Sequence, residues 1–129
     1  MFTLDQIKAA HSKVKSGADF LAYIQELKAL GVLHYETFVA EGNTNYYGAN
    51  AYNIIGDAKY PALSVAETTD GEQFKSALKA HQQGKTDYPT FCSDCAEAGI
   101  LKWQVNLEAM TCTYIDTAGF EILVEEIPS

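Results

Sequence analysis

The chain has 129 residues, of which 47% are hydrophobic, and a formal net charge of −8 at pH 7. This length and composition predict one folded domain over residues 1–129 and argue against intrinsic disorder. The acidic balance repels phosphate backbones, and no segment has the roughly 20 apolar residues of a membrane span, so we expect neither nucleic acid nor a membrane as partner.

Two helices are predicted first along the chain. Thr3 and Gln6 form a capping-box pattern that starts the first helix, and the stretch 15–18 breaks it. Asp19 can cap the second helix, because its carboxylate can accept from free backbone N–H groups. Apolar residues then recur at helical spacing up to Gly31, a residue that tolerates the left-handed conformation at a helix end.

The pattern then changes to residues that are typical of β-strands. The predicted strands are 32–40, 45–50 and 52–55, with a hairpin turn at 41–43 and a further candidate strand at 62–67.

The second half of the chain predicts the same order of elements. Thr69 and Glu72 form another capping-box pattern, and the helix they start runs through His81. Asp87 can cap the next helix, which Gly99 ends. Strands are then expected at 101–107, 111–116 and 120–127, with a hairpin turn at 116–119.

A register of 68 residues relates the two halves without a gap from residue 19 to residue 55. It aligns Gly31 with Gly99, Tyr35 with Trp103, and Tyr46 with Tyr114. The predicted fold class is therefore α+β, with an internal duplication of an ααβββ unit in halves of about 1–67 and 68–129. We expect an antiparallel sheet with the helices packed against it, and Tyr35 and Trp103 on its buried face.

Cys92 and Cys95 form a C-x-x-C pair, the most conspicuous motif in the chain. Together with His81 and Cys112 they could form a zinc site, and alone they could form a redox dithiol. The repeat places both on the apolar stripe of a helix, where cysteine packs as a small hydrophobic residue. We therefore expect buried, unbonded cysteines, with no metal and no cofactor.

The start of the chain and its cysteine count bear on location. The first residues lack the charged and apolar regions of a signal peptide, and three cysteines are an odd number for a disulfide framework. The expectation is a reduced, cytoplasmic protein.

Tyrosines are dense between residues 46 and 60, where they could line a ligand groove or an interface. We predict a binding surface formed by Tyr46, Tyr47 and Tyr60, with His81 nearby at a helix end. The predicted function is a non-enzymatic module that binds an unknown small molecule or protein, as a monomer or homodimer.

An enzymatic alternative remains open at this point. His81 could act as a base, with Cys92 or Cys112 as the nucleophile. His11 occupies a similar position near the end of the first helix, and each histidine could either stabilise its helix end or line a site. The sequence has no Gly-rich phosphate loop and no HExxH or GxSxG motif.

Several runs of residues resemble one protein family over essentially the whole chain. They are the segments 81–92 (HQQGKTDYPTFC), 98–103 (AGILKW) and 111–116 (TCTYID), the ending at 126–128 (EIP) and the segment 16–20 (SGADF). These segments resemble the YdfO/YbcV-like family of bacterial and prophage proteins, a domain of unknown function sometimes labelled a phage envelope protein. The resemblance implies a compact, prophage-associated α+β domain and assigns no catalytic residue.

Overall fold

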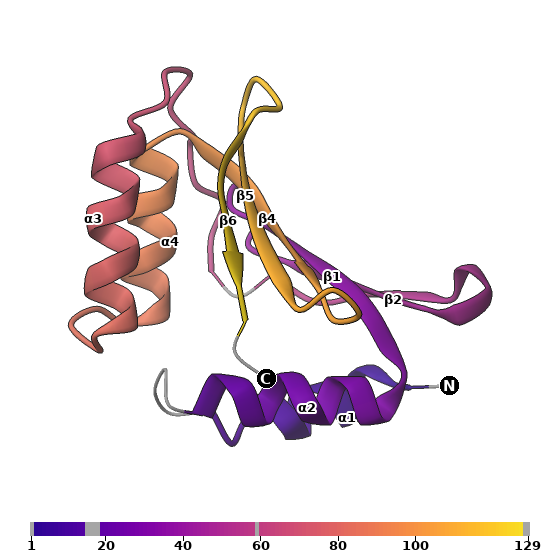
Figure 1. Cartoon of the computed structure of the whole chain (residues 1–129). Helices are drawn as coiled ribbons and strands as arrows, with labels where there is room; N and C mark the ends of the chain where they lie inside the picture. Colours follow the sequence, from indigo (N-terminus) through magenta and orange to yellow (C-terminus); the bar gives the residue numbers. More distant parts are fainter. Residues whose placement is uncertain (1, 15–18, 59, 128–129) are drawn as a thin grey trace.

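The computed structural model describes residues 2–14, 19–58 and 60–127, so the predicted break at 15–18 lies outside the described residues. The described helices are α1 (Leu4–His11), α2 (Phe20–Leu30), α3 (Gly71–Gln82) and α4 (Tyr88–Glu97) (Figure 1). The strands are β1 (Val32–Phe38), β2 (Thr44–Gly48), β3 (Asn53–Ile55), β4 (Ile100–Asn106), β5 (Thr111–Asp116) and β6 (Glu121–Glu126). A short 3₁₀ turn (Ala49–Ala51) separates β2 from β3.

The six strands form one antiparallel sheet in the order β3-β2-β1-β4-β5-β6. The predicted α+β class is therefore confirmed. Two helices followed by three strands occur twice along the chain, and β1 pairs with β4 where the two groups of strands meet. The duplication of one ancestral unit stays a prediction.

The strand pairing follows the 68-residue register. Tyr35 pairs with Tyr46 across β1 and β2, and the aligned residues Trp103 and Tyr114 pair across β4 and β5. Both first strands also have a register irregularity at their start, again 68 residues apart. Each half thus contributes one cross-strand pair of aromatic residues, called an aromatic rung below, to the same face of the sheet.

Two helix starts follow the predicted capping chemistry. The Thr3 hydroxyl accepts from the Gln6 N–H, and the Gln6 side chain accepts from the Thr3 N–H, which completes the capping box of α1. Asp87 accepts from the Thr90 N–H at the start of α4, and the hydrogen bonds from Thr90 lower the pKa of its carboxyl group.

Two other helix starts differ from the prediction. Asp19 occupies the cap position of α2 in a helical backbone conformation, without a side-chain cap hydrogen bond. The cap of α3 is Asp70 rather than Thr69, and Asp70 accepts from the Gln73 N–H. The Thr69 hydroxyl instead donates to Asp116 at 2.8 Å, so a tertiary contact takes the side chain that the local pattern assigned to the helix.

The predicted strand at 62–67 is wrong, because this segment forms no ladder with the sheet. It crosses the molecule with isolated backbone hydrogen bonds, from Leu63 to Ala40 and from Ala66 to Ala96. The segment connects the two halves, and its apolar side chains Leu63 and Val65 pack on the core.

The two faces of the sheet have different surroundings. One carries the buried aromatic rungs and receives the helices, which gather on one side of the strands (Figure 1). The opposite face carries alternate residues that are exposed or half-buried, such as His34, Glu36 and Gln104. Any enclosed site is therefore expected on the helix-covered face.

Candidate functional site

A cleft of about 830 Å³ lies over the helix-covered face of the sheet, between the two helix pairs. Side chains of α1 and α2 line one wall, and side chains of α3 and α4 line the other. Residues of β1, β2, β4 and β5 form the floor, and the chain after β6 passes the cleft at Ile127. The volume falls in the range of small-molecule sites, roughly 300–1,000 Å³.

The floor of the cleft is aromatic. The rung Tyr35–Tyr46 has ring centroids 5.7 Å apart, and the rung Trp103–Tyr114 has centroids 6.1 Å apart. Each of these four residues keeps only 6–7% of its surface exposed, so the floor is closely packed. Trp103 also contacts Phe91 at 5.6 Å between centroids, which joins the floor to the α3–α4 wall.

Each wall carries one histidine packed on an aromatic ring. His11, the last residue of α1, meets Tyr23 of α2 edge-on at 5.4 Å between centroids. His81 of α3 stacks on Phe91 of α4 at 4.5 Å. Tyr23 and Phe91 are aligned by the 68-residue register, so the two halves build corresponding histidine–aromatic pairs on opposite walls.

The position of His81 is set by its own helix end. Its Nδ1 lies 3.2 Å from the carbonyl oxygen of Thr86 and 3.4 Å from the Thr86 hydroxyl. The turn between α3 and α4 therefore orients the ring on the wall. Gly84, with φ of 76°, supplies the left-handed residue of that turn.

The phenols around the cleft stay neutral at physiological pH. Burial raises the pKa of Tyr35, Tyr46 and Tyr114 above the ordinary value for tyrosine, and the same holds for Tyr23 and Tyr88 on the walls. The floor can therefore offer uncharged hydroxyl groups beside apolar ring surface.

Charged side chains gather at the rim. Lys8 of α1 forms an ion pair with Asp57 at 3.1 Å. The remaining charged lining residues are Lys85, Asp87, Glu125 and Glu126. Carboxylates thus outnumber ammonium groups around the opening.

The cysteines are buried and unbonded, as predicted. Cys92 and Cys95 are fully buried on α4, and Cys112 borders the cleft floor with 8% of its surface exposed. Burial raises the pKa of all three thiols, that of Cys112 to about 12. Among the described residues, no group of three or more histidine, cysteine or acidic side chains could hold a metal ion.

We expect Cys95→Ser to lower the free energy of unfolding by roughly 1–3 kcal/mol, because it buries a hydroxyl group in an apolar site. Cys92→Ser should cost less, because the Tyr60 and Tyr88 hydroxyls lie within hydrogen-bonding reach of that position. Urea denaturation of the two variants measures the difference. A larger loss for Cys92→Ser would contradict this account of the two sites.

The structure brings two of the four predicted site residues together. Tyr46 and His81 both line the cleft. Tyr47 follows Tyr46 on the strand and lies on the opposite face, where its ring stacks on His34 at 4.5 Å. The Tyr60 hydroxyl donates to the Val39 carbonyl at 2.7 Å, so this ring covers the end of β1 outside the cleft lining.

Other lining residues were not among the predicted site residues, notably His11, Tyr23, Tyr35 and Trp103. A signal for them exists in the repeat. A histidine near the end of the first helix and an aromatic residue at aligned positions of the second helix and first strand occur in both halves.

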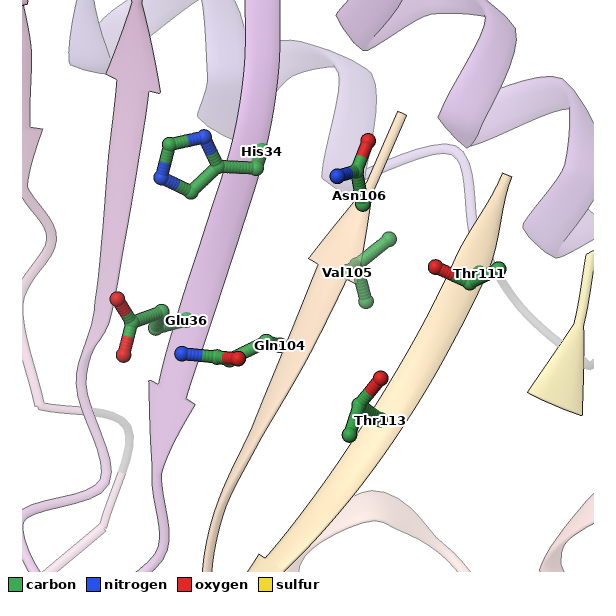
Figure 2. Close-up of a pocket in the computed structure, with 7 residues that line it drawn as sticks. All are labelled: His34, Glu36, Gln104, Val105, Asn106, Thr111 and Thr113. Atoms are coloured by element: carbon green, nitrogen blue, oxygen red, sulfur yellow. The ribbon is translucent and has the colours of Figure 1, made fainter. Parts of the chain in front are cut away.

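The open face of the sheet has a shallow polar hollow of about 300 Å³. Figure 2 shows that its side chains come from three adjacent strands; they include His34, Glu36, Gln104 and Thr113. Burial acts to raise the pKa of Glu36, but hydrogen bonds from Lys102, at 3.0 Å, and from Gln104 outweigh it and lower the pKa. These polar side chains hydrogen-bond to one another, which is typical of a solvated sheet face.

Comparison with known proteins places the chain in a family. The family described as "Protein of unknown function (DUF1398)" matches residues 8–126. The chain belongs to this family. Its helix pairs, its sheet and the residues that line the cleft fall almost entirely within the matched range. The finer resemblance to YdfO/YbcV-like proteins, and the association with prophages, stay predictions.

Curated relatives carry no functional description in their names. The chain is 22% identical to the uncharacterized protein YcgX of Escherichia coli over 115 residues, which cover 89% of this chain and 86% of YcgX. It is 38% identical over 61 residues to the uncharacterized protein Rv2012 of Mycobacterium tuberculosis, a match that covers 47% of this chain and 34% of Rv2012. Among the described residues, no helix combines the length and apolarity needed to cross a membrane.

Proposed function

We propose that this protein is a non-enzymatic binding module that holds a small molecule in the cleft between its two helix pairs. The observation that carries the proposal is the aromatic floor formed by the two rungs, Tyr35–Tyr46 and Trp103–Tyr114, beneath a cleft of about 830 Å³. Small-molecule sites are typically concave and mostly apolar, with a few polar groups that fix orientation.

The distribution of polar groups supports a ligand with an apolar or aromatic body. The floor offers rings with neutral hydroxyl groups, and each wall adds one imidazole, from His11 and His81. Such a lining can stack on a planar body and hydrogen-bond to polar atoms at its edges.

The enzymatic alternative has weaker support from the geometry. Cys112 and His81 line the same cleft, so one nucleophile–base pair shares the site. The thiolate is the nucleophilic form of cysteine, and a pKa of about 12 keeps Cys112 protonated at neutral pH. Cys92 is fully buried and does not line the cleft. A binding role requires no such ionisation.

The reduced state of the cysteines supports a further part of the proposal. Three free, buried thiols fit a reducing compartment such as the cytoplasm. We also propose that the two halves derive from one duplicated ααβββ unit. Their aromatic rungs recur 68 residues apart, and each half has a histidine near the end of its first helix, packed on an aromatic residue at an aligned position.

The neutral probe N-phenyl-1-naphthylamine tests the proposed function. Trp103 is the single tryptophan of the chain and lies on the cleft floor, so energy transfer from its emission reports occupancy of this site. We expect saturable quenching of Trp103 emission together with a rise in probe emission. Failure to quench Trp103 at any accessible probe concentration would count against the proposal.

A pair of matched variants locates the probe. Leu78→Phe narrows the cleft from the α3 wall, whereas Val124→Phe makes the same kind of change on β6, at a residue that is 51% exposed and pairs with Thr113 of the open face. We expect Leu78→Phe to weaken probe binding and Val124→Phe to leave it unchanged. Equal effects of both substitutions would place the probe elsewhere.

A further inference from the structure

The charges at the rim of the cleft bear on the sign of the charge that a ligand carries. The Lys8–Asp57 ion pair, at 3.1 Å, offsets one positive and one negative charge. This leaves the carboxylates of Asp87 and Glu125 against the single ammonium group of Lys85. Glu126 pairs with Thr111, so its side chain points to the open face of the sheet and is not counted. An anion entering the cleft would therefore meet a net negative rim, and a cation would be attracted to it.

Neighbouring residues hold the Glu125 carboxylate in place. Glu125 is half-buried on β6, pairs with Cys112 of the floor, and accepts from the Gln82 side chain at 3.2 Å. Its carboxylate is thus held where β6 meets the end of α3. Partly buried charges are screened less by salt than exposed ones, so the bias toward cations should persist at physiological ionic strength.

The floor favours the same charge. The face of an aromatic ring is electronegative, and tryptophan attracts cations more strongly than tyrosine or phenylalanine does. Trp103 lies among Tyr88, Phe91 and Tyr114, with ring centroids at 6.4, 5.6 and 6.1 Å. All four residues line the cleft, so a cationic group bound there would lie beside this cluster of rings.

We propose that the cleft selects an amphipathic organic cation, with its positive charge on an aromatic or otherwise apolar body, over an anion of the same shape. This inference rests on the proposed small-molecule binding function and adds the charge class of the ligand. The occupant is a small molecule rather than a protein segment, because the aromatic floor and the carboxylate rim enclose a volume of ligand size.

Three probes of similar shape test the inference: tetraphenylphosphonium, tetraphenylborate and neutral triphenylphosphine oxide. Each is titrated against the protein in 150 mM salt, with Trp103 emission as the readout, so that long-range effects of the net charge are screened. We expect tetraphenylphosphonium to bind about tenfold or more tightly than tetraphenylborate, a difference of about 1.4 kcal/mol or more.

A charge-matched pair of double variants assigns the preference to the rim. Asp87→Asn with Glu125→Gln removes both of these carboxylates from the rim, and asparagine can still cap α4. Glu72→Gln with Glu121→Gln removes two exposed carboxylates outside the cleft lining. The first pair should reduce the ratio of cation to anion affinity severalfold, and the second should leave the ratio unchanged. An equal reduction by both pairs would overturn the inference, because net charge alone would then explain the preference.

The outcomes also separate this inference from the proposed function. Equal or tighter binding of tetraphenylborate would overturn the cation preference and leave small-molecule binding in place. Binding of the neutral oxide with no cation preference would do the same. If none of the three probes changes Trp103 emission, both the inference and the proposed function fail.

Discussion

Gly99→Ala is expected to lower the free energy of unfolding by roughly 2–5 kcal/mol. Gly99 follows α4 with φ of 83°, a conformation that side chains disfavour. A Cβ atom there would lie 2.7 Å from the Thr68 carbonyl oxygen and 3.0 Å from the Thr69 Cα atom. Backbone atoms cannot rotate out of the way as a side chain can. In addition, the hydrogen bond from the Asp70 N–H to the Ala98 carbonyl holds residues 68–70 beside Gly99. Urea denaturation measures the loss.

Gly31→Ala is the internal control for this prediction. Gly31 occupies the aligned position after α2 with φ of 102°. Apart from its own helix and chain neighbours, no atom of the described residues lies within 4 Å of the place that its Cβ would take. Only the cost of placing alanine in the left-handed conformation applies, so we expect the free energy of unfolding to fall by about 1–2 kcal/mol. Equal losses for both variants would show that the close approach of residues 68–69 contributes nothing.

The difference between these two glycines shows what the sequence could and could not supply. The repeat and the end of each helical stripe identify both residues as helix stops, and the left-handed conformation follows. Nothing in the local pattern indicates that the connection between halves passes beside only one of them. Residues 62–67 likewise have a strand-like composition, yet they pair with no strand of the sheet. Their backbone instead donates hydrogen bonds to Ala40 and Ala96, which only the tertiary structure brings beside them.

The candidate site could be predicted from the sequence to a similar extent. Tyr46 and His81 were identified from tyrosine density and from a helix end, and they do line one cleft. Tyr47 could not join them, because neighbouring residues of a strand point to opposite faces. The sequence pattern also marked Tyr35 and Trp103 as buried, but it did not show that the helix pairs leave a space above them. That space depends on how two helix pairs pack on a twisted sheet, which is a property of tertiary structure.

The α3–α4 wall of this cleft depends on one fully buried ring, that of Phe74 on α3. Phe74 contacts Tyr114 of the floor at 4.8 Å between centroids, and so fixes the helix pair to the second half of the sheet. We expect Phe74→Ala to lower the free energy of unfolding by roughly 3–5 kcal/mol, because it removes apolar contacts and leaves a cavity. Calorimetry and urea denaturation measure this loss.

Phe120→Ala makes the same chemical change at a ring that is 68% exposed in the β5–β6 turn, where Asp116 accepts from the backbone N–H of residue 120. This hydrogen bond does not involve the ring, so the expected change is within about 0.5 kcal/mol. At temperatures where the Phe74→Ala variant is still folded, that variant should also bind the naphthylamine probe more weakly. The reason is that the wall carrying His81 loses the contact between Phe74 and Tyr114 of the floor. A stable Phe74→Ala variant with unchanged probe binding would show that α3 is held by other contacts and that the cleft does not depend on this ring.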